Sequence, residues 1–385
     1  MGEQLKTITE PQVRFRGFTD EWEQVKVADI FNVTRGKVLS KDLVSVDKSD
    51  DNIYPVYSSQ TSNDGLMGYY NEYLFDKAIT WTTDGANAGT VNYRGAKFYS
   101  TNVNGVLLSD EGYVNQCVAE ILNKIAWKYV SKVGNPKLMN NIMSDIPITI
   151  PHIEEQQKIG NLFQILDALA ASSNEQVENL NQQKQALLQR LFPQKGETVP
   201  KVRFDGFSDA WEEVKLGDVV ADKSIKLGRG KVIAKTELNN EGLGYPVYSS
   251  STVNKGLMGY SYTYDFSNEM ITWSIDGGGH FFYRHDHHYS ITNVSGYMLV
   301  DDSVFDYKYL SEMLELQRPR FEFDYQNKAH PSVIKTLYRV YLPSLEEQQA
   351  IGNLFKTLDE QIGHAEDKVN QYKELKQALL QRLFV

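Results

Sequence analysis

Cysteine, long apolar runs and an excess of basic residues are scarce or absent in this sequence. The 385 residues include one cysteine, Cys117, so no disulfide can form within the chain. No apolar run is long enough for a signal peptide or a membrane span. We therefore expect a cytoplasmic protein that has no membrane partner.

The net charge of −10 at pH 7 is spread evenly along the chain, and no long segment is basic. A protein that binds nucleic acid by itself usually has a basic surface, because it must neutralise phosphates. Any nucleic-acid contact of this chain is therefore expected to use local basic loops. Partner proteins would then supply most of the phosphate neutralisation.

The common enzyme motifs are also missing. The sequence has no dinucleotide-binding glycine fingerprint, no P-loop and no HExxH zinc helix. A glycine run at 276–279 could suggest a phosphate-binding loop, but Asp84-Gly85-Ala86-Asn87 at the related place lacks it. A tight turn between strands is the favoured interpretation of both stretches.

Two possible metal sites are weighed and not favoured. A histidine group has no counterpart in the first half, where a duplicated structural metal site would need one; its members are His280, His285, His287 and His288. The triplet Glu213-Val214-Lys215 has the spacing of some metal-dependent nuclease sites. Its counterpart begins with Gln24 and lacks that carboxylate, so an exposed strand edge is expected instead.

Two long helical segments stand out against these absences. Residues 154–192 and 346–384 are copies of one another, both beginning EEQQ-x-IGNLF and ending KQALLQRLF. Apolar residues recur at alternating steps of four and three, the pattern of a coiled-coil seam. A lone stripe of this kind needs a partner surface in water, so we expect the two helices to pair with each other. The seam residues are Ile159, Phe163, Leu166, Val177, Leu180, Leu187, Ile351, Phe355, Leu358, Val369, Tyr372 and Leu379.

The repeat extends over almost the whole chain. VRFRGFTDEWEQVK at 13–26 returns as VRFDGFSDAWEEVK at 202–215, and YPVYSS, GLMGY and TNV also return in order. Short alternating runs broken by Asn, Asp and Gly predict strands, with a helix and a last strand after them. The predicted class is α+β, an internal duplication with pseudo-twofold symmetry. The predicted segments are 1–151 (first globular domain), 152–192 (helix), 193–199 (linker), 200–343 (second globular domain) and 344–385 (helix).

Basic loops that recur in both halves are the candidate nucleic-acid contacts. An Arg-Gly-Lys triplet occurs at 35–37 and again at 229–231, where glycine would let the backbone approach a phosphate between two cations. The loops 86–97 and 278–289 differ between the halves and are where two domains would read different ligands. The candidate contact residues are Arg35, Lys37, Arg94, Lys97, Arg229, Lys231, Arg284, His285, His287 and His288.

These features together resemble one family. The FxGFxxxWExVK opening, the W-T/S-x-DG strand end and the EEQQ-x-IGNLF helices are similar to specificity (S) subunits of Type I restriction–modification enzymes, over essentially the full chain. The resemblance implies two target recognition domains that each read one half of a split DNA sequence. It also implies two long helices that form an antiparallel coiled coil and set the distance between the domains.

The resemblance further implies the partners and cofactors. Two modification subunits would bind the helices, carry S-adenosylmethionine and methylate adenine at N6, and would recruit ATP-driven restriction subunits. The chain itself would be a non-catalytic reader of double-stranded DNA, with no cofactor of its own; S-adenosylmethionine, ATP and Mg²⁺ would lie on the partners.

Two alternatives stay open at this point. The chain could be a scaffold that carries two binding modules, which do not bind DNA, on a coiled-coil strut. It could also be a self-sufficient nuclease, although the missing metal carboxylates disfavour that interpretation.

Overall fold

The structure is a computed structural model that describes residues 11–59, 62–194, 196–324 and 326–384. Residues 1–10 of the predicted first domain, Lys195 of the predicted linker and the last residue of the predicted second helical segment lie outside the described residues. The chain divides into two compact units. Unit 1 comprises Met1–Asn174 and Asp367–Val385, and unit 2 comprises Glu175–Glu366. Each unit therefore takes part of both long helices, and the five-segment division of the chain stays a prediction.

The described part of unit 1 contains three small sheets that are mainly antiparallel, as the alternating runs predict. The largest has the order β2-β8-β5-β6, a second has the order β4-β3-β7, and β1 pairs with β9. All pairs are antiparallel except β3 with β7. The bounds are β1 Glu23–Lys26, β2 Asn32–Arg35, β3 Tyr54–Tyr57, β4 Leu66–Tyr70, β5 Ala78–Thr82, β6 Val91–Arg94, β7 Tyr99–Ser100, β8 Asn104–Leu108 and β9 Pro147–Ile150.

Unit 2 repeats this topology strand for strand. Its sheets have the orders β11-β17-β14-β15, β13-β12-β16 and β10-β18. The parallel pair recurs as β12 with β16, and the same bulge interrupts β12 as interrupts β3. The bounds are β10 Glu212–Lys215, β11 Ile225–Arg229, β12 Tyr245–Tyr248, β13 Leu257–Ser261, β14 Met270–Ser274, β15 Phe281–Arg284, β16 Ser290–Ile291, β17 Ser295–Val300 and β18 Arg339–Leu342.

Shorter helices cover the sheets of each unit. The helix predicted after the strands of each half is present as α2, which is followed by a 3-10 turn, in unit 1 and as α6 in unit 2. In the described part of the two units, four further helices (α1, α3, α5 and α7) have no clear period in the sequence because each is too short to show one. The bounds are α1 Val27–Ile30, α2 Gln116–Ile125, α3 Asn140–Ser144, α5 Leu216–Ala221, α6 Tyr307–Gln317 and α7 Pro331–Leu337.

A tryptophan on the central strand organises the core of each unit. Trp81 on β5 is buried, and its indole N–H donates to the carbonyl of Leu138 at 3.0 Å. The neighbouring strand carries Gly105, where a Cβ atom would lie only 2.0 Å from the indole ring. Trp273 and Gly296 repeat the arrangement in unit 2. The repeated tryptophan motif therefore needs a glycine on the facing strand.

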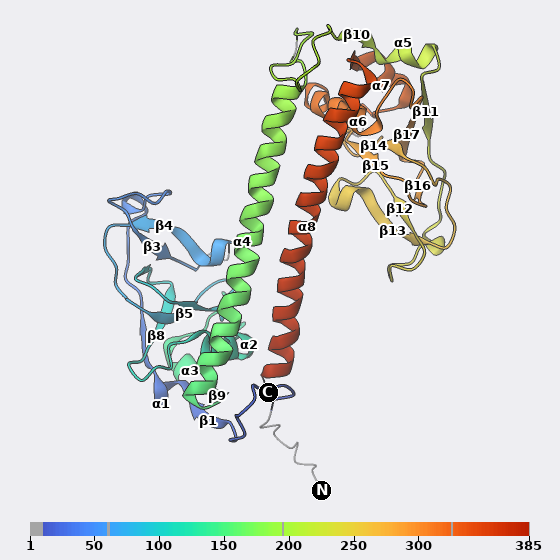
Figure 1. Cartoon of the computed structure of the whole chain (residues 1–385). Helices are drawn as coiled ribbons and strands as arrows, with labels where there is room; N and C mark the ends of the chain where they lie inside the picture. Colours follow the sequence, from blue (N-terminus) through green and yellow to red (C-terminus); the bar gives the residue numbers. More distant parts are fainter. Residues whose placement is uncertain (1–10, 60–61, 195, 325, 385) are drawn as a thin grey trace. The chain divides into compact units, whose positions relative to one another are not determined.

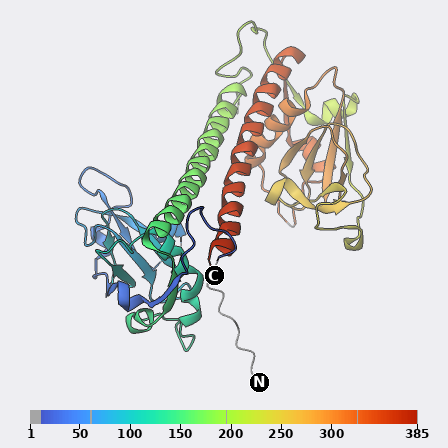
Figure 2. The same ribbon diagram turned by 60° about the horizontal axis from the view of Figure 1, so that its bottom comes forward.

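Both long helices are continuous, as their heptad pattern predicts. The helix α4 runs from Ile153 to Leu191, and α8 from Leu345 to Leu383 (Figure 1). Every seam residue named above is buried or half-buried. In unit 1, seen from a second side in Figure 2, α2 and the first half of α4 share one hydrophobic core.

The helices pair antiparallel within each unit. In unit 1 the ring of Phe163 lies 5.8 Å from that of Phe384, and Asp167, one turn later on α4, pairs with Lys376, two turns earlier on α8. In unit 2 the rings of Phe192 and Phe355 are 6.0 Å apart. Moving forward along α4 thus means moving backward along α8, which confirms the predicted direction of pairing.

One expectation about the helices is wrong. The near-identity of the two helices suggests that Gln156, Gln157, Gln348 and Gln349 are all outward residues. Gln157 and Gln349 are exposed, but Gln156 and Gln348 are buried because their side-chain amides hydrogen-bond to groups inside each unit. The Gln156 amide donates to the Pro151 carbonyl and accepts from Asn115, whereas Gln157 is exposed.

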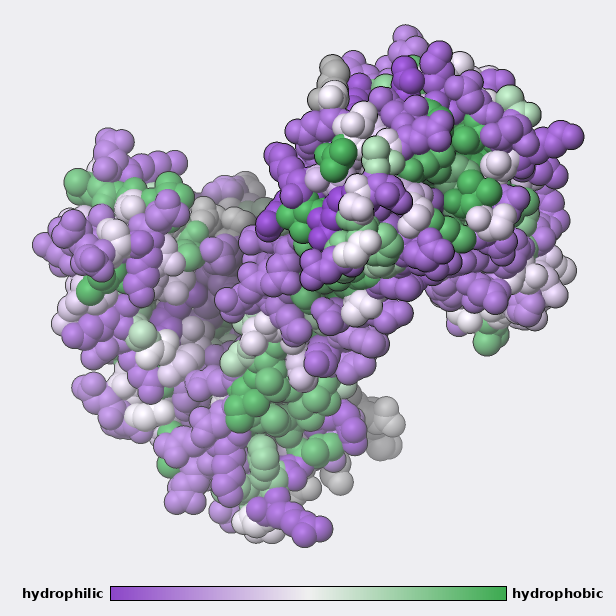
Figure 3. All heavy atoms as spheres, turned by 45° about the horizontal axis from the view of Figure 1, so that its top comes forward, coloured by the Kyte–Doolittle hydropathy of each residue, from purple (hydrophilic) through white to green (hydrophobic). Residues whose placement is uncertain are grey.

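The surface is largely hydrophilic on the face shown in Figure 3, with separate hydrophobic patches. Among the residues that the structure describes, no helix is both long enough and apolar enough to cross a membrane.

Candidate nucleic-acid interface

The Arg-Gly-Lys loops follow the first strand of each four-stranded sheet. In both units the central glycine is packed tightly: a Cβ atom on Gly36 would lie 2.1 Å from the Ser100 carbonyl oxygen, and one on Gly230 would lie 2.3 Å from that of Ile291. The lysine then forms a parallel bridge with Thr101 or Thr292. Glycine is therefore required here for contact with the protein's own backbone.

The basic side chains of these loops are exposed in both units. In unit 2, Arg229 donates two hydrogen bonds to the carbonyl of Asn293, and Lys231 pairs with Asp265 at 2.5 Å. In unit 1, Arg35 and Lys37 lie at the matching surface positions. The structure therefore leaves all four charges at the surface, where a phosphate could reach them.

Arg94 and Arg284 lie inside the protein, with 8% and 4% of their surface exposed. The Arg94 guanidinium stacks on Tyr57 with 3.6 Å between the carbon and the ring centroid, and its Nε donates to Thr80 at 3.2 Å. Arg284 stacks on Tyr248 at 3.7 Å and donates to Thr272 at 3.0 Å. Their role in direct DNA contact stays a prediction, and their visible role is structural.

Each buried arginine also donates a hydrogen bond to the backbone of a neighbouring turn. The Nη2 atom of Arg94 donates to the carbonyl oxygen of Asp64 at 2.6 Å, and that of Arg284 donates to Lys255 at 2.7 Å. Burial lowers the pKa of both guanidinium groups; that of Arg284 is lowered to about 10, so Arg284 remains charged at neutral pH. The turns at 62–65 and 253–256 were not predicted as part of the candidate interface. The signal that could have indicated them is that their side chains differ while the residues around them mostly match between the two halves.

Lys97 and the histidines occupy the loops that differ between the halves. Lys97 is exposed and its ammonium lies 4.4 Å from the centroid of the Tyr73 ring. In unit 2, His285 stacks on His287, which stacks on Tyr289, with centroids 4.3 and 4.5 Å apart. The structure thus gathers Arg284, His285 and His287 around Tyr248 and Tyr289, and His288 packs against Tyr264 with 4.1 Å between the ring centroids.

Two contacts decide the tautomer of the His287 ring in its neutral form. Its Nδ1 lies 2.7 Å from the carbonyl oxygen of His285, so it donates, and Nε2 accepts from the Tyr248 hydroxyl at 3.2 Å. Burial lowers the pKa of His287 and is a larger effect than the hydrogen bond to the His285 carbonyl, which raises it; the charges of His285 and Arg284 lower the pKa further. The neutral imidazole is therefore the form that fits this loop.

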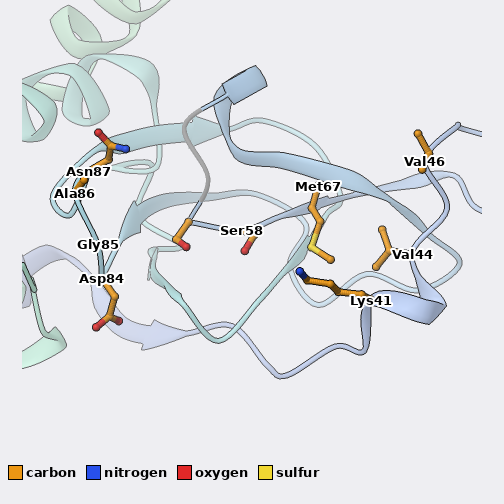
Figure 4. Close-up of a pocket in the computed structure, with 10 residues that line it drawn as sticks. Lys41, Val44, Val46, Ser58, Met67, Asp84, Gly85, Ala86 and Asn87 are labelled. Atoms are coloured by element: carbon orange, nitrogen blue, oxygen red, sulfur yellow. The ribbon is translucent and has the colours of Figure 1, made fainter. Parts of the chain in front are cut away.

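In unit 1, an open cleft of about 520 Å³ lies beside the divergent loop 86–97 (Figure 4). Lys41 and Met67 line one side of it, and Asp84 to Asn87 line the other, with Ser58 between them. The cleft therefore joins the start of the divergent loop 86–97 to the stretch that leads into the turn at 62–65. Its lining offers both donors and acceptors, which a reader of base edges needs.

The other stretches weighed in the sequence have structural explanations. The glycine run at 276–279 is a turn between β14 and β15, with Gly278 and Gly279 at φ of +87° and +75°. Glu213 lies on β10 opposite Tyr341, and its carboxylate lies 3.9 Å from Arg339. Within the described ranges, no group of three or more His, Cys, Asp or Glu residues is placed to hold a metal ion.

Two lysines at matching positions of the long helices, Lys184 and Lys376, connect each globular part to the helix pair. Lys184 on α4 lies 2.8 Å from Glu312 on α6 and 2.7 Å from Asp359 on α8. In unit 1, Lys376 on α8 lies 2.8 Å from both Glu120 on α2 and Asp167 on α4. Burial alone would lower the pKa of either lysine, but the carboxylates outweigh it and raise both. Each lysine thus fastens a domain helix to the helix pair.

Comparison with known proteins assigns the chain that contains this duplicated interface to a protein family. The family model for the Type I restriction modification DNA specificity domain matches residues 19–182 and again residues 208–373. The chain belongs to this family. Its two copies of the specificity domain correspond to the two repeats, and DNA specificity in type I restriction–modification is its function.

Individual relatives agree with this assignment. A Mycoplasma pneumoniae protein that carries the name of a type I specificity subunit, S.MpnORF507P, is 29% identical over 333 residues, 85% of this chain and 86% of that protein. The specificity subunit of the type I restriction enzyme MpnII, from the same organism, is 33% identical over 162 residues, 41% of this chain and 47% of that subunit.

A solved structure has the same fold as this specificity protein. The crystal structure of the S subunit of a type I restriction–modification system from M. genitalium matches with a TM-score of 0.78 and 14% sequence identity. The match covers 98% of this chain and 99% of that one. It supports the duplicated α+β fold with two long helices.

Proposed function

We propose that each unit reads one half of a bipartite DNA target, and that the chain brings modification and restriction subunits to that target. The observation that carries this proposal is the duplicated interface. Both units have exposed basic Arg-Gly-Lys loops, a buried arginine and a divergent loop at matching positions. A constant scaffold with different exposed side chains is suited to reading two different short sequences.

The partners in this proposal are modification subunits that methylate adenine at N6, and restriction subunits bound through them. The net charge of −10 supports such partners, because DNA phosphates need cations that this chain does not supply in excess. The chain itself is non-catalytic in this proposal. S-adenosylmethionine, ATP and Mg²⁺ are bound by the partner subunits.

Two modification subunits are expected because the chain offers the same helical surface twice. Gln157 and Asn161 lie one turn apart on α4 and are exposed, as are Gln349 and Asn353 on α8. Residues four apart share one face of a helix. Native mass spectrometry at saturating subunit concentration should show two modification subunits per chain, and a stable complex with one would contradict this stoichiometry.

The DNA-reading proposal is tested by selection from a random duplex library. The purified complex with the modification subunit should enrich two short defined blocks separated by a gap of fixed length. The chain alone should neither cleave DNA nor transfer methyl groups. A single continuous block, or cleavage by the isolated chain, would overturn the proposal.

A further inference from the structure

The turns Ser62–Gly65 and Val253–Gly256 concentrate the differences between two otherwise matching stretches. Residues 54–70 and 245–261 are identical except for four pairs. Three of these pairs lie in or beside the turn, and only the fourth lies elsewhere, at the end of β4 and β13. The pairs are Gln60/Ser251, Ser62/Val253, Asp64/Lys255 and Tyr70/Ser261.

Both turns have the same unusual backbone. Asn63 and Asp64 have φ of +51° and +50°, and Asn254 and Lys255 have φ of +50° at both positions. Residues other than glycine rarely adopt this left-handed backbone conformation. They keep it where contacts with the surrounding structure hold the backbone in place. Here the turn is closed by a backbone bond from Ser58 to Gly65 at 2.8 Å, repeated between Ser249 and Gly256 at 2.7 Å.

The buried arginine supplies the second restraint. It donates to the carbonyl oxygen of Asp64 or Lys255, while its own position is set by a tyrosine ring and a threonine hydroxyl. The backbone of the turn is therefore held from inside the domain. The side chains of Asp64 and Lys255 are exposed and carry opposite charges at the same place.

We propose that these turns each read a base in their half of the DNA target, with Asp64 and Lys255 as specificity-determining residues and with Arg94 and Arg284 as positioning residues. This inference rests on the proposed function of the two units. A carboxylate accepts hydrogen bonds from exocyclic amino groups, so Asp64 selects cytosine or adenine. An ammonium donates to the O6 and N7 atoms of guanine, so Lys255 selects guanine.

The test is the reciprocal swap Asp64→Lys with Lys255→Asp. The swap conserves net charge, and each residue type already adopts the required backbone in the other unit. The complexes of the wild type and the swap with the modification subunit are used to select duplexes from a random library. A matched control exchanges Asp110→Lys with Lys226→Asp, which are exposed residues, one in each unit.

The swap should change one base position in each half of the target, by at least about tenfold in preference, and leave the gap and the other positions unchanged. The control should keep the wild-type target. An unchanged target, or a uniform change in affinity for all sequences, would overturn the proposal because the turn would then contact only phosphates or nothing. A wild-type complex that selects no two-part target would instead refute the proposed function.

A second variant covers a swap that fails to fold. Lys255→Met keeps an unbranched side chain that is one heavy atom shorter and removes its charge, so one position of one half-site should accept any base while the other half stays selective. Arg284→Lys should relax that same position, because lysine cannot both stack on Tyr248 and reach the turn. Equal weakening on every sequence in both variants would contradict the assignment.

Discussion

Arg14 donates two hydrogen bonds to the buried carboxylate of Glu155, at 3.0 and 2.7 Å, and so fastens the start of unit 1 to α4. Arg203 and Glu347 repeat this pair in unit 2 at 2.8 and 2.7 Å. The indole of Trp211 adds a third bond, at 3.0 Å, to Glu347. The second glutamate of each EEQQ motif is thus an internal anchor for the VRF segment.

Removal of either arginine should destabilise its unit, because a buried carboxylate would lose its cation. We expect Arg14→Ala to lower the free energy of unfolding by about 3 kcal/mol. Arg203→Ala should lower the free energy of unfolding by less than Arg14→Ala does, since the Trp211 indole still donates to Glu347. Urea unfolding of the two variants gives the comparison. The double variant Arg14→Leu with Glu155→Leu serves as the control and should recover much of the loss; equal losses in both single variants would contradict the role of the indole.

A pH dependence should arise in unit 2 from His287. Its pKa is lowered in the folded protein, so the unfolded chain takes up a proton first as the pH falls. Stability contributed by the neutral ring is therefore fully present above the ordinary histidine pKa of about 6.5 and decreases below it. Unfolding measured at several pH values through this range should show that the free energy of unfolding falls as the pH falls. This decrease should be smaller in the variant His287→Asn. An unchanged decrease in the His287→Asn variant would show that another group is responsible. The matched control is His152→Asn in unit 1, which should keep the pH dependence of the wild type.

The helix pair should act as a spacer between the two half-sites, since both helices contribute to both units. Seven residues added between Asn174 and Glu175 and seven between Glu366 and Asp367 would preserve the heptad seam. Each insertion lengthens its helix by about 10 Å, comparable to roughly three base pairs of DNA at about 3.4 Å each. Methylome sequencing should show a longer gap with unchanged half-sites. An unchanged gap in a folded, active complex would mean that another element sets the spacing.

The helix pair, the duplication and the α+β class were predictable because their signals lie in the sequence itself. A heptad seam is a local period, and a repeat appears on alignment of the chain with itself. The parallel pairing of β3 with β7 was not predictable, because strands of two to four residues carry no signal of their partner. The strand edge at Glu213 was predictable from comparison of the two halves, because the counterpart of Glu213 is Gln24, which lacks the carboxylate that a metal site would need.

The candidate site was predictable in outline and not in detail. A basic residue after tyrosine, as at Arg94 and Arg284, suggests an exposed contact. Only the fold shows that a tyrosine ring and a turn carbonyl enclose each guanidinium. The glycine of each Arg-Gly-Lys loop similarly suggested an approach to phosphate, whereas the backbone it approaches is its own. Such contacts join residues far apart in sequence and leave no periodic trace.

The central claim is that each unit reads its own half of a split target, and a unit exchange tests it most directly. Residues 200–343 are replaced by the corresponding segment of another family member with a different target, and the methylated sites are mapped by methylome sequencing. We predict that one half of the target changes to that of the donor, while the other half and the gap length stay as in the wild type. A change in both halves, or in neither, would contradict the account.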